Sequence, residues 1–515
     1  MPVPRLLPLS VALATAFALP AYGQSLIDLY ESARSYDATY QGARAQYDAT
    51  LARAAQARAG ILPAVGLSAG SSHTEQELTT ENLSTTRGLN THNVGINATQ
   101  PLYRPANWAA YEQSKRQADI AQAQLTIAEQ DLVLRVSQAY FDVLASQDSL
   151  ALVRAQKVAV AEQLAFAKRN FEVGTSTITD TREAQARYDL VIAQEIAAEN
   201  DLQVKKIVLD QLVGRQGSVP TPLAAPVVLP TVGPTDIEAW VAQGETTHPA
   251  IQQARLGLDV ATLEVRKAEA GHLPTLDATL GYNVTNNPQG TTTSTTTGRV
   301  RVNAASIGVV FNMPLFAGYA TENRIKETLA LEEQSRTVLD STRRSVNQAT
   351  RAAYLGLVSG AGQVKALEAA EASSQVALDA NRLGYQVGVR INIDVLNSQS
   401  QLFQTKRDLA LSRYNVLLGN LRLRQANGTL TPEDLRPINA TLATNGRTAV
   451  DSTGPAPASR EVPAPTPVPG TAPQPLPAPT PIPVVPPVQT PPFNPQPPVM
   501  PSPPPQPEIV LPPSR

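Results

Sequence analysis

The sequence contains no cysteine and few aromatic residues, which make up only 5% of the chain. The absence of cysteine excludes disulfides, thiolate metal sites and a lipid-modified N-terminal cysteine. So few aromatic residues argue against a large, aromatic-filled globular core. Neither sign of charge is in excess, with 42 Lys and Arg against 44 Asp and Glu, so nothing indicates nucleic-acid binding. After residue 23 there is no apolar run of about 18 residues, the length that a transmembrane helix needs.

The first 23 residues have the features of a secretory signal peptide. Arg5 supplies the positive charge, residues 6–19 form a short apolar run, and residues 21–23 resemble a small-x-small cleavage site. A membrane anchor is the alternative, but the run is shorter than a membrane span and is interrupted by Pro8. We therefore expect an exported protein whose mature chain begins at Gln24.

Two stretches of ten residues, 171–180 and 385–394, are copies of one another. Each contains Val-Gly and, six residues after the glycine, an aspartate, which is Asp180 in one copy and Asp394 in the other. Glycine supplies the backbone freedom that a tight turn between two helices needs. The aspartate then falls in the first turn of the next helix, where a negative charge is favourable. The pattern predicts two helix-to-helix turns, here called the first tip (171–180) and the second tip (385–394).

The rest of the chain repeats with the same period, because matching features lie 211 to 214 residues apart. Each repeat is expected to contain a helix, two strands, a long helix and a second helix. From Pro455 to the end, 26 of 61 residues are proline, which is typical of an extended, disordered segment. The expected divisions are a signal peptide at 1–23, a first repeat at 24–213, a Pro- and Gly-rich connector at 214–234, a second repeat at 235–428, a closing segment at 429–450 and a Pro-rich tail at 451–515.

Hydrophobic periodicity predicts where the elements of each repeat lie. In the first repeat we expect a helix from Ser25 to about 59, strands at about 63–72 and 94–103 around a polar stretch at 73–92, and helices at 105–170 and 180–213. In the second repeat we expect a helix from the capping box at 235–238 to Gly271, strands at 275–284 and 306–315 around a Thr-rich loop at 286–298, and a long helix at 319–383.

The strands alternate cleanly between apolar and small polar residues although they lie between very long helices. An exported chain without transmembrane helices can cross a bilayer only as a closed β-barrel. Four strands cannot close a barrel, so three chains would supply twelve. Two short helices also match one long helix in length, so such helices could surround a tunnel. A soluble coiled-coil protein with two ordinary hairpins is the alternative. The residues expected to face lipid are Val65, Leu67, Leu280, Tyr282, Val309 and Phe311.

The two tips, together with the motifs at 178–180, 393–396, 401–402, 410–415 and 428–430, resemble those of TolC-family outer-membrane channel-tunnels. The resemblance covers residues 25–435. It implies an α+β membrane protein in which a trimeric twelve-stranded outer-membrane barrel continues into an α-helical coiled-coil periplasmic tunnel. It further implies export of proteins or small molecules from a Gram-negative cell, in a tripartite type I secretion or efflux system. The implied partners are two further copies of the chain, a periplasmic adaptor, an inner-membrane ABC or RND transporter, and outer-membrane lipid.

The resemblance also assigns roles to residues of the tips. A gate of Asp180, Thr179, Tyr385 and Arg390 is implied, in which Asp180 accepts hydrogen bonds from Tyr385 and Arg390 of its own subunit and Arg390 reaches Thr179 of the next. Asp394 and Asn397 match a charged constriction, with one acid fewer here. Alternatively, Asp180 and Asp394 are simple helix N-terminal acids and Arg390 is a solvated charge. The residues expected to dock the adaptor are Val173, Gly174, Thr175, Val387, Gly388 and Val389.

Other polar and aromatic residues give weaker indications. The four histidines are scattered and indicate no metal site, no cofactor motif is present, and no nucleophile–histidine–acid set indicates an enzyme. A passive surface or periplasmic coiled-coil protein, such as an adhesin, is the alternative function. Four aromatic residues near the strand ends could form an interfacial belt or pack at the junction of strands and helices. They are Tyr103, Trp108, Phe316 and Tyr319.

Overall fold

The computed structural model of the chain describes residues 23–80, 83–224, 227, 233, 235–290 and 298–443. The expected tail at 451–515 and the expected signal peptide, apart from Gly23, lie outside these residues, as does most of the Thr-rich loop. Both repeats contain the expected succession of elements. The first repeat consists of α2 (Leu26–Tyr36), α3 (Ala38–Arg58), the 3-10 turn η1 (Ala59–Ile61), β1 (Ala64–Thr80), β2 (Leu83–Tyr103), α4 (Pro105–Glu172) and α5 (Ile178–Val213).

The second repeat follows the same order, and a short closing segment comes after it. The helices of the second repeat end close to their expected limits except at its start. The second repeat consists of α6 (Ile237–Thr247), α7 (Pro249–Glu269), the 3-10 turn η2 (Ala270–His272), β3 (Thr275–Asn287), β4 (Val300–Asn312), α8 (Ala320–Gln386) and α9 (Asn392–Ala426), and the closing segment contains η3 (Pro432–Asp434) and α10 (Leu435–Ala440).

The first helix of each repeat is broken, and the prediction of one continuous helix in these places is wrong. Asp37 leaves the helical conformation and caps α3, because its carboxylate accepts a hydrogen bond of 2.8 Å from the backbone N–H of Tyr40. Arg135 of α4 holds the same carboxylate with two bonds of 2.9 and 3.0 Å. In the second repeat the break is at His248, the residue before Pro249, where an α conformation is sterically disfavoured. Asp236, rather than Thr235, caps α6.

The four strands form one antiparallel sheet in the order β1-β2-β3-β4, so the two repeats are joined by pairing of β2 with β3. Residues that were expected to face lipid lie on one face, since Leu67 is opposite Ile96 and Ile96 is opposite Tyr282. The next row, with Gly66 opposite Asn97, belongs to the other face. All six expected lipid-facing side chains are 50% to 74% exposed in the single chain. The sheet therefore has one apolar, uncovered face and one face of small and polar residues.

The first hairpin is longer than expected, because β1 and β2 continue through the polar stretch at 73–92, which lies outside the expected strands. The two strands stay paired as far as Thr80 and Leu83. Polar side chains bond across the hairpin, with 2.9 Å between Ser71 and His92 and 2.7 Å between His73 and Asn90. Backbone ladder bonds need no apolar partner, so a strand can extend beyond the region where hydrophobic alternation reveals it. β4, in contrast, ends at Asn312, short of the expected residue 315.

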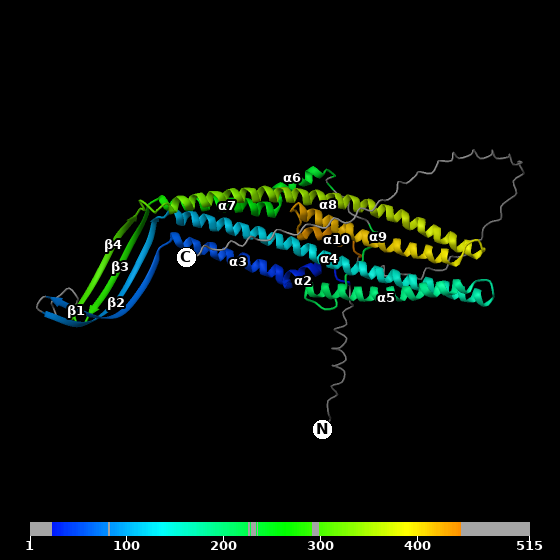
Figure 1. Ribbon diagram of the computed structural model, residues 1–515, viewed down its shortest axis with the longest axis horizontal. Helices are drawn as coiled ribbons and strands as arrows, with labels where there is room; N and C mark the ends of the chain where they lie inside the picture. The colour runs from blue at the N-terminus through cyan, green and yellow to red at the C-terminus, as the bar shows by residue number, and fades with distance from the viewer. Residues whose placement is uncertain are drawn as a thin grey trace, which may run out of the picture. The chain divides into compact units, whose positions relative to one another are not determined.

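The helices pack in pairs that meet at the tips. α4 packs along α5 and α8 packs along α9, while α3 and α7 continue alongside α4. Each long helix is thus accompanied by two shorter ones, as the lengths predicted. Among residues 23–443, the strands lie beyond one end of the helices and the two tips lie at the other (Figure 1). None of the described helices combines the length and the apolar character needed to cross a membrane.

The largest buried cluster lies where α2, the first helix that the structure describes, meets the closing segment. Leu26 of α2, Tyr140 of α4, Leu417 of α9 and Leu435 of α10 have 0% exposure in this cluster. The backbone N–H of Leu26 also donates to the side chain of Asn439 over 3.1 Å. Part of the connector is fixed here as well, since the Tyr140 hydroxyl donates to the Thr221 carbonyl over 2.9 Å. The core therefore holds the helix pairs together midway between the strands and the tips.

Candidate functional site at the helix tips

Both tips are closed by the same backbone turn. Gly174 and Gly388 have φ of 77° and 79°, the left-handed conformation that glycine adopts without strain. In the first tip the N–H of Gly174 donates to the Phe171 carbonyl over 3.0 Å, and the N–H of Thr175 donates to Asn170 over 2.8 Å. The same two bonds recur in the second tip. This is the Schellman arrangement, which satisfies the last carbonyls of a helix, and it confirms the two predicted turns.

Apolar side chains cover the outer surface of both turns. The exposed fractions are 72% for Val173, 65% for Val387 and 80% for Val389, and Thr175 is also exposed. The expected adaptor-docking residues are therefore accessible in the single chain.

Asp180 is held within its own tip. Its carboxylate accepts hydrogen bonds from the hydroxyls of Ser176 and Thr177, at 2.7 and 2.9 Å, and from the backbone N–H of Thr177 at 3.0 Å. With the N–H of Asp180 donating to Thr177, this is a complete capping box. Burial would raise the pKa of Asp180, but the bonds from Ser176 and Thr177 hold it below its ordinary value. The helix-capping alternative describes Asp180 correctly in the single chain.

The second tip repeats this contact with a cation in place of the hydroxyl. Arg390, which corresponds to Ser176, lies 3.7 Å from the carboxylate of Asp394. The Arg390 side chain is 58% exposed, so this pair is weak and Arg390 is accessible from outside the chain. In each tip, the aspartate carboxylate thus interacts with the side chain of the residue four positions earlier.

Tyr385 does not make the contact that was expected of it in the gate. Its ring packs edge-on against Phe166 of α4, with 5.7 Å between ring centroids, and its hydroxyl is buried without a hydrogen-bond partner among the described residues. Within the part of the chain that the structure describes, neither Tyr385 nor Arg390 bonds to Asp180, and Thr179 is exposed. The single chain therefore does not join the four expected gate residues.

Asn392 connects the two helix pairs, and the sequence analysis did not single it out. It is completely buried at the beginning of α9. Its side-chain oxygen accepts a hydrogen bond from Gln163 of α4, and its side-chain N–H donates to the backbone carbonyl of Asp180 over 3.2 Å. The signal was available, since the first repeat has Ile178 at this place, and a buried amide needs partners that an isoleucine does not.

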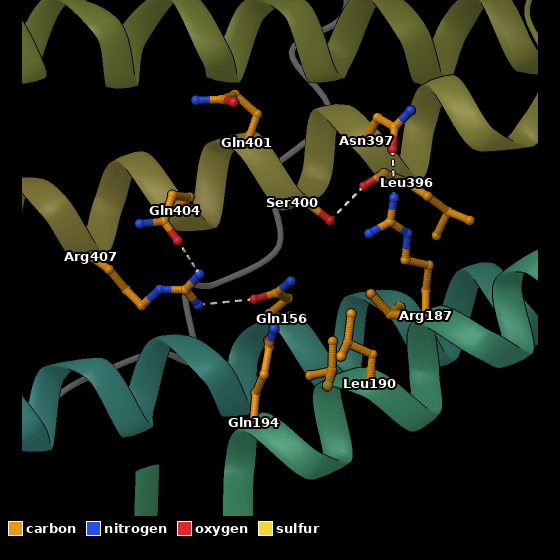
Figure 2. Close-up of a pocket in the computed structure, with 12 residues that line it drawn as sticks. Gln156, Arg187, Leu190, Gln194, Leu396, Asn397, Ser400, Gln401, Gln404 and Arg407 are labelled. Atoms are coloured by element: carbon orange, nitrogen blue, oxygen red, sulfur yellow. Dashed lines mark hydrogen bonds between the residues drawn. The ribbon is translucent and has the colours of Figure 1, made fainter. Parts of the chain in front are cut away.

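The expected constriction contains a positive charge that the sequence analysis did not foresee. Arg187 of α5 donates a hydrogen bond of 2.9 Å to the side-chain oxygen of Asn397, as Figure 2 shows. Asp394, one helical turn earlier on α9, is partly exposed. The residue that stands in place of one expected acid therefore bonds to a guanidinium of the neighbouring helix pair. The described residues contain no group of three or more His, Asp or Glu that could hold a metal ion.

Comparisons with known proteins agree with this architecture. The family model described as "Outer membrane efflux protein" matches residues 29–215 and 240–429. The outer membrane protein TolC of Vibrio cholerae is 33% identical over 439 residues, covering 85% of this chain and 98% of that protein. The alkaline protease secretion protein AprF of Pseudomonas aeruginosa is 29% identical over 431 residues, covering 82% and 88%. The open-state structure of the Neisseria gonorrhoeae MtrE outer membrane channel matches with a TM-score of 0.64 at 17% identity, covering 80% and 92%.

Proposed function

Because the chain belongs to the outer membrane efflux protein family, we propose that three copies close a twelve-stranded barrel and continue it into one helical tunnel. At the level of the family the function is established: the chain is an outer-membrane channel of a Gram-negative bacterium that serves efflux or type I secretion. Members of this family are channels and not enzymes. The alternative of a passive adhesin or structural coiled coil is thereby excluded.

The sheet is the observation that supports trimer formation. β1 and β4 are its outer strands, and neither has a partner on its outer edge among the described residues. Unpaired backbone N–H and carbonyl groups cannot remain exposed in hydrocarbon, where water does not satisfy them. Pairing β1 of one chain with β4 of the next removes every edge. The uncovered apolar face then contacts lipid, and the small polar face lines the channel.

Cysteine chemistry tests this arrangement without background, because the chain has no cysteine. Cysteines at Leu67 and Leu280 should react with a lipid-soluble maleimide, whereas matched cysteines at Gly66 and Gly281, on the opposite face, should react with a water-soluble one. A cysteine at Ser68 of β1, combined in turn with cysteines along β4, should give a covalent trimer on oxidation. Equal reaction of both faces with the water-soluble reagent, or a covalent dimer as the end product, would contradict the proposal.

The exposed aromatic residues fit the boundary between membrane and water. Trp108 and Tyr319 lie just after the strands and are 52% and 63% exposed in the single chain. Tyr103 and Phe316 are exposed as well. Their exposure favours an interfacial belt over packing at the junction of strands and helices.

The tips are proposed to dock the periplasmic adaptor that connects the channel to an inner-membrane ABC or RND transporter. The support is the pair of equivalent, exposed valine turns at the end opposite the strands (Figure 1). Photo-crosslinking residues at Thr175 and Val389 should trap one periplasmic protein in intact cells, and the same residue placed at Val158 of α4, also exposed, should not. Identifying the trapped protein also identifies the class of transporter.

We further propose that the tips form the gate. Arg390 and Thr179 are exposed, as contacts between neighbouring subunits require. The Tyr385 hydroxyl has no hydrogen-bond partner among the described residues. Within one chain, Asn392 ties the second tip to the first. The proposed division also keeps a signal peptide at 1–23, repeats at 24–213 and 235–428 separated by the connector at 214–234, a closing segment at 429–450, and a periplasmic tail at 451–515 that is not needed for assembly.

A further inference from the structure

A polar cavity lies directly beside the proposed constriction. It has a volume of about 410 Å³, is partly open to solvent and is lined by residues of α4, α5 and α9. Asn397, one of the two residues expected at the constriction, belongs to its wall, as do Arg187 and Arg407 (Figure 2). None of the residues that line it is acidic. Two cations therefore share a cavity with no carboxylate.

Arg407 is held only by neutral oxygens. It donates to the side-chain carbonyl of Gln156 over 3.1 Å and to that of Gln404 over 2.7 Å. It has no ion pair among the described residues, and Gln156 is only 4% exposed. Burial lowers the pKa of the Arg407 guanidinium, although Asp408 acts in the opposite direction. A partly desolvated cation with amide partners gains more from an anion than an exposed arginine would.

Arg187 and Gln194 complete the wall from α5. Arg187 uses one nitrogen for Asn397 and has no ion pair within the part of the chain that the structure describes, which leaves further N–H groups available. The side-chain oxygen of Gln194 is buried without a hydrogen-bond partner among the described residues. Rotation of this amide about its last bond would direct an N–H group towards the cavity instead. The unsatisfied amide is a second, independent indication that the cavity is built for a polar ligand.

We propose that this cavity binds a small oxyanion, such as a carboxylate or phosphate group, between Arg187 and Arg407. Planar guanidinium groups match the geometry of both oxyanions. The volume accommodates phosphate together with several waters, since one water occupies about 30 Å³. The proposal rests on the proposed function in placing the site beside the channel. There, the two guanidinium groups of the empty cavity would make the passage attract anions, in opposition to Asp394, and a bound oxyanion would neutralise them.

Inorganic phosphate is the probe that tests this inference. The full-length protein in detergent is titrated with phosphate by calorimetry at constant ionic strength, with chloride as the comparison anion. Saturable binding of one phosphate per chain is expected. Arg407→Gln and Arg187→Gln should each weaken it about tenfold or more, because bonds between charged groups are the stronger ones. Arg182→Gln is the matched control, because Arg182 is an exposed residue of the same helix, α5, outside the cavity. Arg407→Lys keeps the charge and should retain part of the affinity.

Planar bilayers provide the second measurement. Because bound phosphate neutralises the two guanidinium charges, phosphate added to wild-type channels should shift the reversal potential towards cation selectivity, and the shift should be absent in Arg407→Gln. If the trimer conducts but phosphate binds no better than chloride, or if Arg182→Gln weakens binding as much as Arg407→Gln does, the anion site is refuted and the channel is not. If the protein forms no channel, the proposed trimer fails, while the calorimetric titration still decides whether the cavity binds phosphate.

Discussion

Replacing Asn392 with leucine should open the tips. Asn392 makes two of the bonds that cross from the second helix pair to the first, to the Gln163 side chain and to the Asp180 backbone. Leucine has a similar size but makes neither bond, so the Gln163 amide and the Asp180 carbonyl lose their partner. Opening the tunnel by moving α8 and α9 away from α4 and α5 breaks the same bonds. The substitution therefore lowers the free energy needed to open the tunnel.

The expected magnitude follows from the surroundings of the two bonds. Each neutral hydrogen bond contributes about 1 kcal/mol net, and the partners left behind are only partly buried, so about 2 to 3 kcal/mol per chain is reasonable. The closed state of the trimer would then lose roughly 6 to 9 kcal/mol of stabilisation relative to the open state. A change of about 5.5 kcal/mol is enough to convert a channel that is 99% closed into one that is 99% open. Asn392→Leu should therefore conduct almost continuously, and Gln163→Leu, which removes one bond, should open less.

Single-channel conductance in planar bilayers is the direct measurement, and entry of large antibiotics into cells is the indirect one. Asn381→Leu is the matched control, because among the described residues the Asn381 side chain bonds only to Ser398, within the second helix pair. It should conduct like the wild type. If Asn392→Leu forms trimers on a gel and still conducts like Asn381→Leu, the link between the helix pairs does not restrain the tips and the reasoning is refuted.

Three further predictions concern the tips and the core. Arg390→Asp should raise conductance by placing a second negative charge beside Asp394, whereas Arg390→Gln should change it less; equal conductance of the two would show that charge at this position is unimportant. Gly428→Ala should lower the free energy of unfolding by about 2 to 5 kcal/mol, because Gly428 has φ of 77° and an added Cβ would lie 2.4 Å from the Cα of His248. Gly217→Ala, with φ of 76° but no atom within 4 Å of an added Cβ, should cost only about 1 to 2 kcal/mol in the same denaturant titration. Burial lowers the pKa of His248, whose neutral ring accepts a hydrogen bond from the N–H of Ala250, so the stability of the protein should fall as the pH drops below 6.5. His248→Asn, which caps the helix without titrating, should make the melting temperature less dependent on pH. An unchanged pH profile would contradict this role of His248.

The duplication, the strand faces and the turns at the tips could be predicted from the sequence because each has a local cause. Glycine permits the left-handed turn at 174 and at 388, and alternation places Leu67 and Leu280 on one face. The break at His248 was also visible, since Pro249 follows it and disfavours a helical residue before it. The break at Asp37 was not, because an aspartate inside a helix and one that caps a helix look alike until Arg135 of a distant helix is brought to it.

The site was less predictable because its contacts join residues far apart in the chain. Comparison of the repeats could single out Asn392, because the first repeat has Ile178 at the same place, but nothing local indicated Gln163 as its partner. Arg187 and Arg407 belong to different repeats, so the sequence does not show that they line one cavity. The roles given to Asp180, Tyr385 and Arg390 came from family resemblance. The implied bonds from Tyr385 and Arg390 to Asp180 of the same subunit are absent among the described residues, because Asp180 bonds to Ser176 and Thr177 and Arg390 lies beside Asp394.

The pairing of β2 with β3 has a consequence for how the protein folds. Ile96 pairs with Tyr282, 186 residues later, and ribosomes add about 5 to 20 residues per second. The β1–β2 hairpin, a local structure, can therefore form roughly 10 to 40 s before the strand that extends its sheet has been made. During this interval an apolar face and an open strand edge are exposed together, the combination that promotes aggregation. We expect the first hairpin to be the segment of the nascent chain most dependent on chaperones, and strand pairing between chains to be the last step of assembly.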